Sequence, residues 1–551
     1  MITKVAVLTG YFLTVLIIGF IARTRLKSSP ESYFLADRKL GTLVLLGTMV
    51  STNFSAFTVF GTSGAGYRDG YAFFPIMGFG TGFMALTFWV LGRKVRHRGR
   101  QKNLLTPPEL IGDLYSNRFL SFVFALVMIV FTIPYLALQP MAAGYVLEEL
   151  VGLPYLYGCV VVTLIIMLYT LRGGLRAVAW TDLFQGTLMF LLLFIALIMV
   201  IHHHGGLVAA NQKVAASWPE LFSRPGGSGK YTPGIWFSFI MLWFFCDPMF
   251  PQLFQRFFSA KTEKTLSRVM LFYPLICTVV FFMPVTMGVM GRLSFPDLVG
   301  RQADRILPMT MTLISGDAMA ALVMTAGLAA LMSTMDSQLL TLSSIFTRDI
   351  VPMFQKEKSR TSTGGRIFVI CLSLIGLALA YKPPATILEI ATQTFTGLAV
   401  LFPTVIFGLY LKKVHALSAI FSILLGEGAL ILFYLKWIPS GIFLPVVWIM
   451  LLAFSAYLLT HGVLQFKNNS IRLTPPQWVR DPYFYMLGGI FVLAMDFWAW
   501  NSSLPMVMGL PLWLGYFVLL SAIQTGVMVV WVKKSETQTY LLGRHKGRPQ
   551  G

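Results

Sequence analysis

Apolar runs of about 20 residues recur along the whole chain, separated by short polar or basic segments. Within each run the apolar residues are continuous rather than alternating, which predicts membrane-crossing helices and argues against a transmembrane β-barrel. The predicted fold class is therefore an all-α polytopic membrane protein. We predict fifteen spans, at 2–22, 42–66, 72–92, 119–147, 153–170, 178–201, 234–254, 268–291, 312–346, 366–381, 385–411, 414–435, 441–460, 483–500 and 510–532.

Composition and charge agree with this pattern. The chain is 56% hydrophobic and 12% charged, whereas a soluble domain carries about 25% charged residues. Most of the 43 Lys and Arg residues fall in alternate connections, which predicts a cell-membrane protein with its N-terminus outside and its C-terminus in the cytoplasm. The net charge of +21 is spread over many loops, so we expect contact with the lipid bilayer and no nucleic-acid partner.

One predicted span contains an unusual polar cluster. The segment LMSTMDSQLL at 331–340 places Ser333, Thr334, Asp336 and Ser337 within about one helical turn. Oxygen-bearing side chains on adjacent helix faces suit a hard cation such as sodium, shared with a neighbouring helix. The alternative is that the hydroxyls bond carbonyls of their own helix.

A second polar stretch is GTMVSTNFSAFTVFGTSGAGY at 47–67, which contains Asn53 and several serines, threonines and glycines. A lipid-facing helix would not have this composition. We interpret it as a broken helix whose free backbone carbonyls point into a binding cavity, as in transporters built from inverted repeats. Close helix packing through small residues is the alternative for its glycines.

Six acidic residues lie within predicted spans, where an ionisable group is a functional candidate by default. We interpret Glu427 and Asp496 as structural, because they lie near helix ends or in peripheral helices. The six residues are Asp182, Asp247, Asp336, Glu389, Glu427 and Asp496.

Four segments resemble those of one transporter family. LRGGLRAVAWTDLFQGTLMF at 171–190 resembles the signature of the sodium:solute symporters, the family of sodium-coupled proline, sialic acid, glucose, pantothenate and monocarboxylate carriers. LAALMSTMDSQLL at 328–340 is similar to core helix 8 of that family. TPPELIGDLYSNR at 106–118 and FQRFFSAKT at 254–262 are similar to the loops after core helices 2 and 6.

The resemblance implies a LeuT-type fold in which two inverted repeats of five helices form the core, with core helices 1 and 6 broken. On this scheme residues 1–41 form an extra helix and a cytoplasmic loop. Residues 42–411 form the core, with repeats at about 42–201 and 234–411. Residues 412–532 add four helices, and 533–551 are a cytoplasmic tail.

The resemblance also implies sodium sites. The first would use the backbone carbonyls of Ser51, Phe54 and Ala330 with the hydroxyls of Ser333 and Thr334. A second sodium, present in some members, would use Asp182, Ser333, Asp336 and Ser337. Asp336 departs from the family's serine, and two carboxylates there would either strengthen ion binding or hold a proton.

The solute pocket is expected among core helices 1, 2, 3, 6, 8 and 10. Asn53 replaces the aspartate of proline carriers, which weakens a proline assignment. We expect no arginine deep in the core, so an anionic solute would rely on helix N-termini and backbone amides. The candidates are Asn53, Thr58, Tyr71, Phe74, Tyr135, Gln139, Trp243, Phe244, Asp247, Gln393 and Thr394.

The predicted function is sodium-coupled symport of a small organic acid, monocarboxylate or amino-acid-like solute into the cell. Its partners would be sodium, the solute and the bilayer, and we expect the monomer to function alone. A proton-coupled symporter on the same fold is the main alternative, and a membrane nutrient sensor a remote one. We expect no enzyme activity, because no catalytic motif lies in a suitable helical context.

Overall fold

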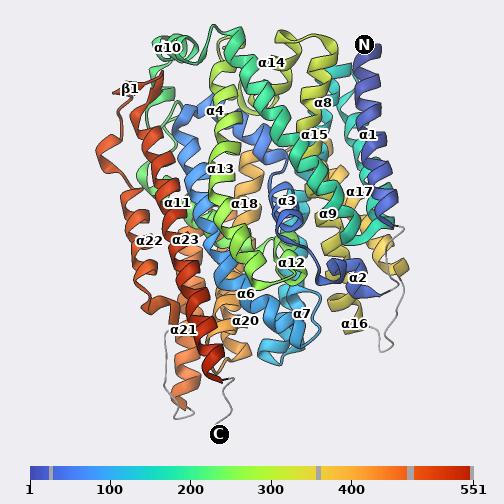
Figure 1. Cartoon of the computed structure of the whole chain (residues 1–551), viewed down its shortest axis with the longest axis vertical. Helices are drawn as coiled ribbons and strands as arrows, with labels where there is room; N and C mark the ends of the chain where they lie inside the picture. Colours follow the sequence, from blue (N-terminus) through green and yellow to red (C-terminus); the bar gives the residue numbers. More distant parts are fainter. Residues whose placement is uncertain (24–28, 355–361, 468–476, 547–551) are drawn as a thin grey trace.

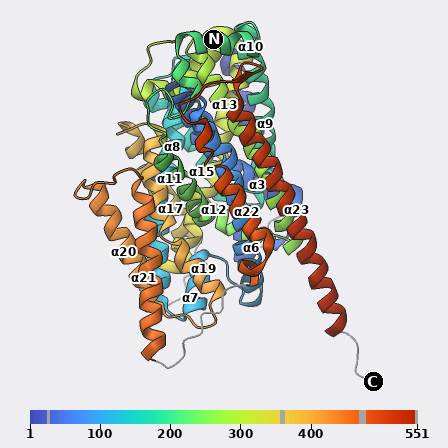
Figure 2. The ribbon, with the colours of Figure 1, turned by 90° about the vertical axis from the view of Figure 1, so that its left-hand side faces the viewer.

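The computed structural model describes residues 1–23, 29–354, 362–467 and 477–546. They form an elongated bundle of helices, with the N-terminus at one end and the C-terminus at the other (Figure 1). The paired helices α20–α21 and α22–α23 lie on the outside of the bundle (Figure 2). Because the apolar helices cover one another only in part, many large apolar side chains remain on the outer face, as a lipid environment requires.

The helices have the following bounds in chain order. They are α1 Ile2–Arg23, α2 Pro30–Leu35, α3 Thr42–Asn53, α4 Thr62–Asp69, α5 Thr81–Met84, α6 Leu86–Gln101, α7 Pro107–Tyr115, α8 Arg118–Val151, α9 Tyr155–His203, α10 Leu207–Ser217, α11 Pro233–Cys246, α12 Pro251–Ser259, α13 Glu263–Gly291, α14 Ile306–Ile314, α15 Asp317–Ile345, α16 Val351–Phe354, α17 Ser362–Tyr381, α18 Ile387–Ala399, α19 Phe402–Tyr410, α20 Ala416–Tyr434, α21 Pro445–Lys467, α22 Pro482–Leu493 and α23 Leu512–Lys546. Strands β1 (Met506–Val507) and β2 (Leu510–Pro511) pair antiparallel before α23.

Among the described residues, eleven helices are long and apolar enough to cross a membrane, and up to thirteen if two bent pairs each count as one span. Two shorter apolar helices, Tyr155–Thr170 and Pro482–Leu493, lie where the remaining predicted spans 153–170 and 483–500 were expected. The loop predicted at 171–177 is helical, and Gly174, with φ of 59°, bends α9 there. A side chain at Gly174 would place Cβ 2.7 Å from the Tyr33 carbonyl oxygen, so glycine permits this close approach.

Both breaks predicted for the core are present. α3 ends at Asn53, Phe54 adopts an extended conformation, and a π-helical turn η2 (Phe57–Gly61) leads into α4, with a bend of 61°. α11 leads through the short 3₁₀ helix η6 (Asp247–Met249) to α12, with a bend of 52°. Proline at the start of α12 lacks the N–H that would continue α11, which explains this second break.

α15 lies in the middle of the bundle and packs against α9, α8, α1 and α17. Its residues from Val323 to Ile345 are all buried, including every polar side chain in that stretch. α3 also packs against α9 and α15. The break in α3 is therefore enclosed by protein, where an irregular backbone is tolerated at membrane depth.

Candidate functional site

The polar cluster of α15 meets the end of α3. The hydroxyl of Ser333 donates to the carbonyl oxygen of Ser51 at 2.9 Å, and the hydroxyl of Thr334 donates to that of Thr52 at 3.1 Å. Both hydroxyls also lie 3.0–3.1 Å from the carbonyl oxygen of Ala330 on their own helix. The contacts to α3 and the contacts within α15, which were alternatives from sequence, are therefore both present.

These carbonyl oxygens are available because α3 stops. The last carbonyls of a helix have no partner within the helix, and those of Ser51 and Thr52 turn to α15 instead. Four of the five predicted sodium ligands, Ser51, Ala330, Ser333 and Thr334, thus lie together. Phe54, the fifth, is the buried residue directly after the end of α3.

A second group of predicted residues lies between the two helix breaks. The amide of Asn53 donates to Asp247 at 3.3 Å and also to the hydroxyl of Tyr273 on α13. Gln139 of α8 accepts a hydrogen bond from the backbone N–H of Ala56 at 3.1 Å and so satisfies a donor freed by the break. Side chains from α3, α8, α13 and the short helix η6 (Asp247–Met249) thereby connect and support the two breaks.

Aromatic rings border this region. The ring of Trp243 lies 5.2 Å from that of Phe57 and 5.0 Å from that of Phe395 on α18. Tyr135 packs on Phe395 at 4.8 Å. The indole N–H of Trp243 and the hydroxyl of Thr58 are both buried without a hydrogen-bond partner. Two unpaired donors close to both helix breaks suit a ligand that accepts hydrogen bonds.

Four of the predicted solute residues lie elsewhere. Tyr71 donates to Asn211 of α10 at 3.0 Å, and Phe74 packs on Phe282 of α13. Phe244 contacts Phe83 and is only partly buried, while Gln393 is exposed. Thr394, the neighbour of Phe395, is buried. The sequence did not indicate which face of α11 points inward, and our prediction missed Phe57, Phe395 and Tyr273.

The expectation that no arginine lies deep in the core was wrong. Arg256 belongs to the segment 254–262 that resembles the loop after core helix 6, yet it lies in α12 with no exposed side-chain surface. Its guanidinium is 3.2 Å from the Asp182 carboxylate and 2.6 Å from the Ser337 hydroxyl. The signal was present in FQRFF, where an arginine stands between aromatic residues and continues an apolar run.

The structural interpretation of Asp496 agrees with its geometry. Both of its carboxylate oxygens accept hydrogen bonds of 2.6 Å from the guanidinium of Arg224, and neither side chain is exposed. Glu389 likewise forms a capping box with Thr386 at the start of α18. Glu427 of α20 makes no side-chain hydrogen bond to any described residue.

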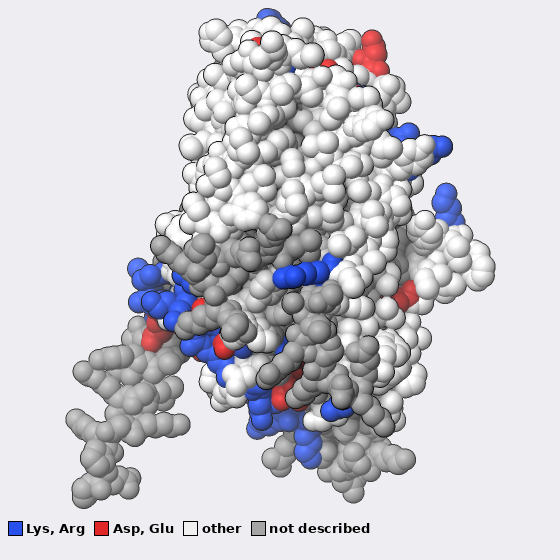
Figure 3. All heavy atoms as spheres, turned by 90° about the vertical axis from the view of Figure 1, so that its right-hand side faces the viewer, with Lys and Arg blue, Asp and Glu red and all other residues white. Residues whose placement is uncertain are grey.

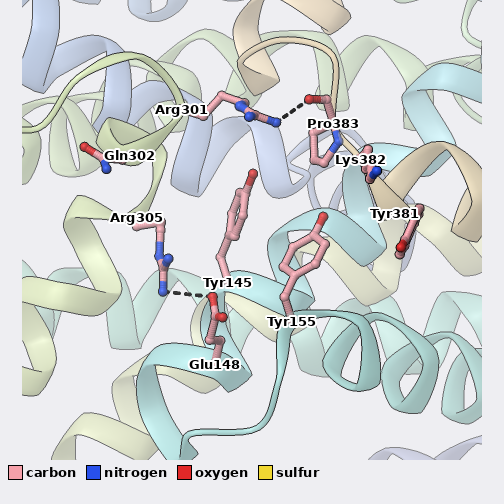
Figure 4. A pocket seen from close by; sticks show the side chains of 9 residues that line it. All are labelled: Tyr145, Glu148, Tyr155, Arg301, Gln302, Arg305, Tyr381, Lys382 and Pro383. Carbon is pink, nitrogen blue, oxygen red and sulfur yellow. Dashed lines mark hydrogen bonds and ion pairs between the residues drawn. The ribbon is translucent and has the colours of Figure 1, made fainter.

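At the end of the bundle that carries the N-terminus, a cavity of about 460 Å³ lies among the ends of α8 and α17, the start of α9 and the 3₁₀ helix η7 (Gly300–Arg305) (Figure 4). Arg305 pairs with Glu148 at 2.9 Å on its wall. Nearby, Asp304 accepts a hydrogen bond from Arg68 at 3.2 Å and from the backbone N–H of Ile387 at 3.0 Å. Burial raises the pKa of Asp304, and the charge of Arg68 opposes that rise. None of the predicted sodium or solute residues lines this cavity.

Known proteins resemble the chain in sequence. The sodium/pantothenate symporter of Haemophilus influenzae is 28% identical over 421 residues, which are 76% of this chain and 86% of that protein. The sodium/proline symporter of Staphylococcus aureus is 26% identical over 446 residues, or 78% of this chain and 85% of that protein.

Solved structures share the fold. A Na⁺-coupled sialic acid symporter aligns with a TM-score of 0.70 and 18% identity, covering 84% of this chain and 98% of that one. Mhp1, a nucleobase-cation-symport-1 family transporter, aligns with a TM-score of 0.55 and 13% identity over 81% of this chain and 97% of that one. The LeuT-type fold predicted for the chain is confirmed. The sodium:solute symporter family profile matches residues 33–426. The chain belongs to this family, and it is a sodium-coupled symporter of a small solute.

Proposed function

We propose that this symporter imports a small organic acid or amino-acid-like solute, and that its sodium ion binds where the break in α3 meets α15. The ligands would be the carbonyl oxygens of Ser51, Phe54 and Ala330 with the hydroxyls of Ser333 and Thr334. The observation that carries this proposal is the contact of Ser333 and Thr334 with the last carbonyls of α3. These buried oxygens, drawn from two helices, are the hard ligands that an alkali cation requires once it leaves water.

The solute would lie between the breaks of α3 and α11–α12. The unpaired donors of Trp243 and Thr58 favour a solute with a hydrogen-bond acceptor such as a carboxylate. Pantothenate and proline, the solutes in the names of the two relatives, both carry a carboxylate group. The aromatic rings of Phe57, Trp243 and Phe395 would enclose the apolar part of the solute.

The membrane orientation proposed here has the N-terminus outside and the C-terminus in the cytoplasm. The two termini lie at opposite ends of the bundle (Figure 1). Lys and Arg gather on the lower part of the face in Figure 3, at the end away from the N-terminus, which favours that end as cytoplasmic. Within this frame we assign residues 42–201 and 234–411 to the inverted repeats and 412–532 to peripheral helices. We further propose that the monomer is the transport unit and that the chain has no enzyme activity.

Sodium would act by binding one conformation better than the other, since only differential affinity can shift the equilibrium between them. Binding to both α3 and α15 holds these helices together and fixes the break that borders the solute pocket. The membrane potential contributes about 2.3 kcal/mol per charge per 100 mV to inward sodium movement. Solute and sodium are released together when the loaded core opens to the cytoplasm.

The test is sodium-dependent solute binding by the purified protein. A thermal-stability screen of amino acids and organic acids, each with sodium and with choline in its place, identifies the solute. Ser333→Ala and Thr334→Ala should then raise the sodium concentration for half-maximal solute binding about tenfold or more, which corresponds to about 1.4 kcal/mol. Thr325→Ala is the matched control, because its hydroxyl lies on α15 but bonds only the Leu322 carbonyl at 2.6 Å. Unchanged sodium dependence in both site variants would count against the site.

A further inference from the structure

Arg256 is the centre of a buried polar cluster that four helices build. Its Nη2 lies 3.1 Å from the Thr48 hydroxyl, 3.0 Å from the Thr52 hydroxyl and 3.2 Å from Oδ2 of Asp182. The fourth partner, the hydroxyl of Ser337, is 2.6 Å away. One nitrogen of a cation is thus surrounded by four oxygens from α3, α9 and α15, while α12 supplies the arginine.

The remaining donors of the guanidinium hold it in this place. Nη1 donates to the Gln252 carbonyl oxygen at 3.0 Å, and Nε donates to Thr48 at 3.3 Å. Asp182 in turn accepts hydrogen bonds from Thr48 and Thr52 on the same oxygen. The side chains of Arg256 and Asp182 have no exposed surface, so water does not compete for these contacts.

The residues expected for a second sodium do not fit that ion in this arrangement. Asp182 and Ser337 contact the Arg256 guanidinium, and Ser333 is directed to the carbonyls of Ser51 and Ala330. A sodium ion between Asp182 and Ser337 would lie where Nη2 of Arg256 lies. It would also meet the repulsion of that fixed positive charge, which is strong in a buried site.

We propose that the Arg256 guanidinium is a built-in cation that takes the place of a second sodium, so that the chain binds one sodium ion. The inference rests on the proposed function, which supplies that one ion between α3 and α15. Three charged groups face the cluster: Arg256 of α12, Asp182 of α9 and Asp336 of α15. Asp336 lies beside them and makes no hydrogen bond with the guanidinium. It is therefore the one remaining group that competes as a ligand for an extra cation.

The experiment counts sodium ions bound to the purified full-length protein, with ²²Na⁺ alone as the probe and without solute. Wild type should bind one ion per chain, and Ser333→Ala should weaken that binding. Asp182→Asn and Asp336→Asn should leave the number at one. Arg256→Gln, which removes the built-in charge, should bind two. Circular dichroism and size-exclusion chromatography establish that each variant is folded.

Each count decides the matter. Two ions on wild type, falling to one in Asp182→Asn or Asp336→Asn, would overturn the inference and leave the sodium site of α3 and α15 standing. No ion on wild type would overturn that site as well. A folded Arg256→Gln that binds one ion would show that the guanidinium is not what excludes the second. If Arg256→Gln does not fold, the counts for wild type and the two aspartate variants still decide.

Discussion

The ion pair of Arg224 and Asp496 offers a strong test of how the peripheral helices join the core. Arg224 lies in the connection between α10 and α11, and Asp496 follows α22. The two form two parallel hydrogen bonds of 2.6 Å, with both side chains fully buried. The rings of Trp500 and Trp513 lie 4.6 and 4.8 Å from the guanidinium carbon. Removing the carboxylate therefore leaves a buried cation without an anion.

The expected cost of Asp496→Asn is about 3–5 kcal/mol, the usual penalty for breaking a buried ion pair on one side. With about 2.1 cal/mol/K of unfolding entropy per residue, that penalty lowers the melting temperature of a chain this long by about 3–4 °C. The double variant Arg224→Met with Asp496→Leu should lose much less stability, because it replaces both charges with apolar groups of similar volume.

The assay is fluorescence-detected thermal unfolding of wild type, the two single variants Arg224→Met and Asp496→Asn, and the double variant, in one detergent. The reasoning requires each single variant to melt below the double variant. The reasoning is refuted if the double variant is as unstable as Asp496→Asn. It is also refuted if Asp496→Asn melts within about 1 °C of wild type. The second outcome would mean that water reaches the pair in solution and replaces the lost partner.

Three further predictions concern the core. Gly288→Ala should destabilise the protein by about 1–3 kcal/mol and lower its melting temperature, because the new Cβ would overlap a carbonyl oxygen of α4. Gly428→Ala is the control: the space around Gly428 is open, so this variant should melt at the wild-type temperature. Gln139→Leu should reduce the free energy of unfolding by about 1–3 kcal/mol, because it leaves the buried backbone N–H of Ala56 at the α3 break unpaired. An unchanged melting temperature would show that Gln139 does not stabilise the break. Trp243→Phe should weaken solute binding about tenfold or more, measured by isothermal titration calorimetry once the solute is known, while ²²Na⁺ binding stays unchanged. An equal loss of solute binding and sodium binding would indicate misfolding instead.

The break after α3 was predictable from the residues for a physical reason, whereas the break before α12 and the meeting of α3 with α15 were expected from the family resemblance. Polar side chains such as Asn53, Ser333 and Thr334 are too costly inside a membrane unless protein or a ligand meets them, so both stretches were expected to face the interior of the bundle. The apolar runs also located the long helices. Their number was less certain, because helices such as Tyr155–Thr170 and Pro482–Leu493 are shorter than a full span.

The position of Arg256 could not be predicted by counting charges. In a one-dimensional pattern, a basic residue after an apolar run reads as a loop, and Arg256 follows the predicted span 234–254. The break before α12 redirects the chain and carries Arg256 inward to Asp182. The orientation of Phe244 escaped prediction for a different reason, because a helix such as α11 that is apolar on all sides gives no periodic signal to orient it.

The short helix α12 lies between the proposed solute pocket and the proposed sodium site. Its nine residues span about 13 Å, a length over which one regular helix moves as a stiff unit. Asp247 lies in η6, four residues before α12 begins, and Trp243 lies on α11 across the break. Arg256, in the second half of α12, contacts Thr52 of α3 and Ser337 of α15. A tilt of α12 on solute binding would be transmitted, through the contacts of Arg256 with Thr52 and Ser337, to α3 and α15, the helices proposed to hold sodium. In the proposed mechanism, solute binding and sodium binding would thus be coupled through this one short helix.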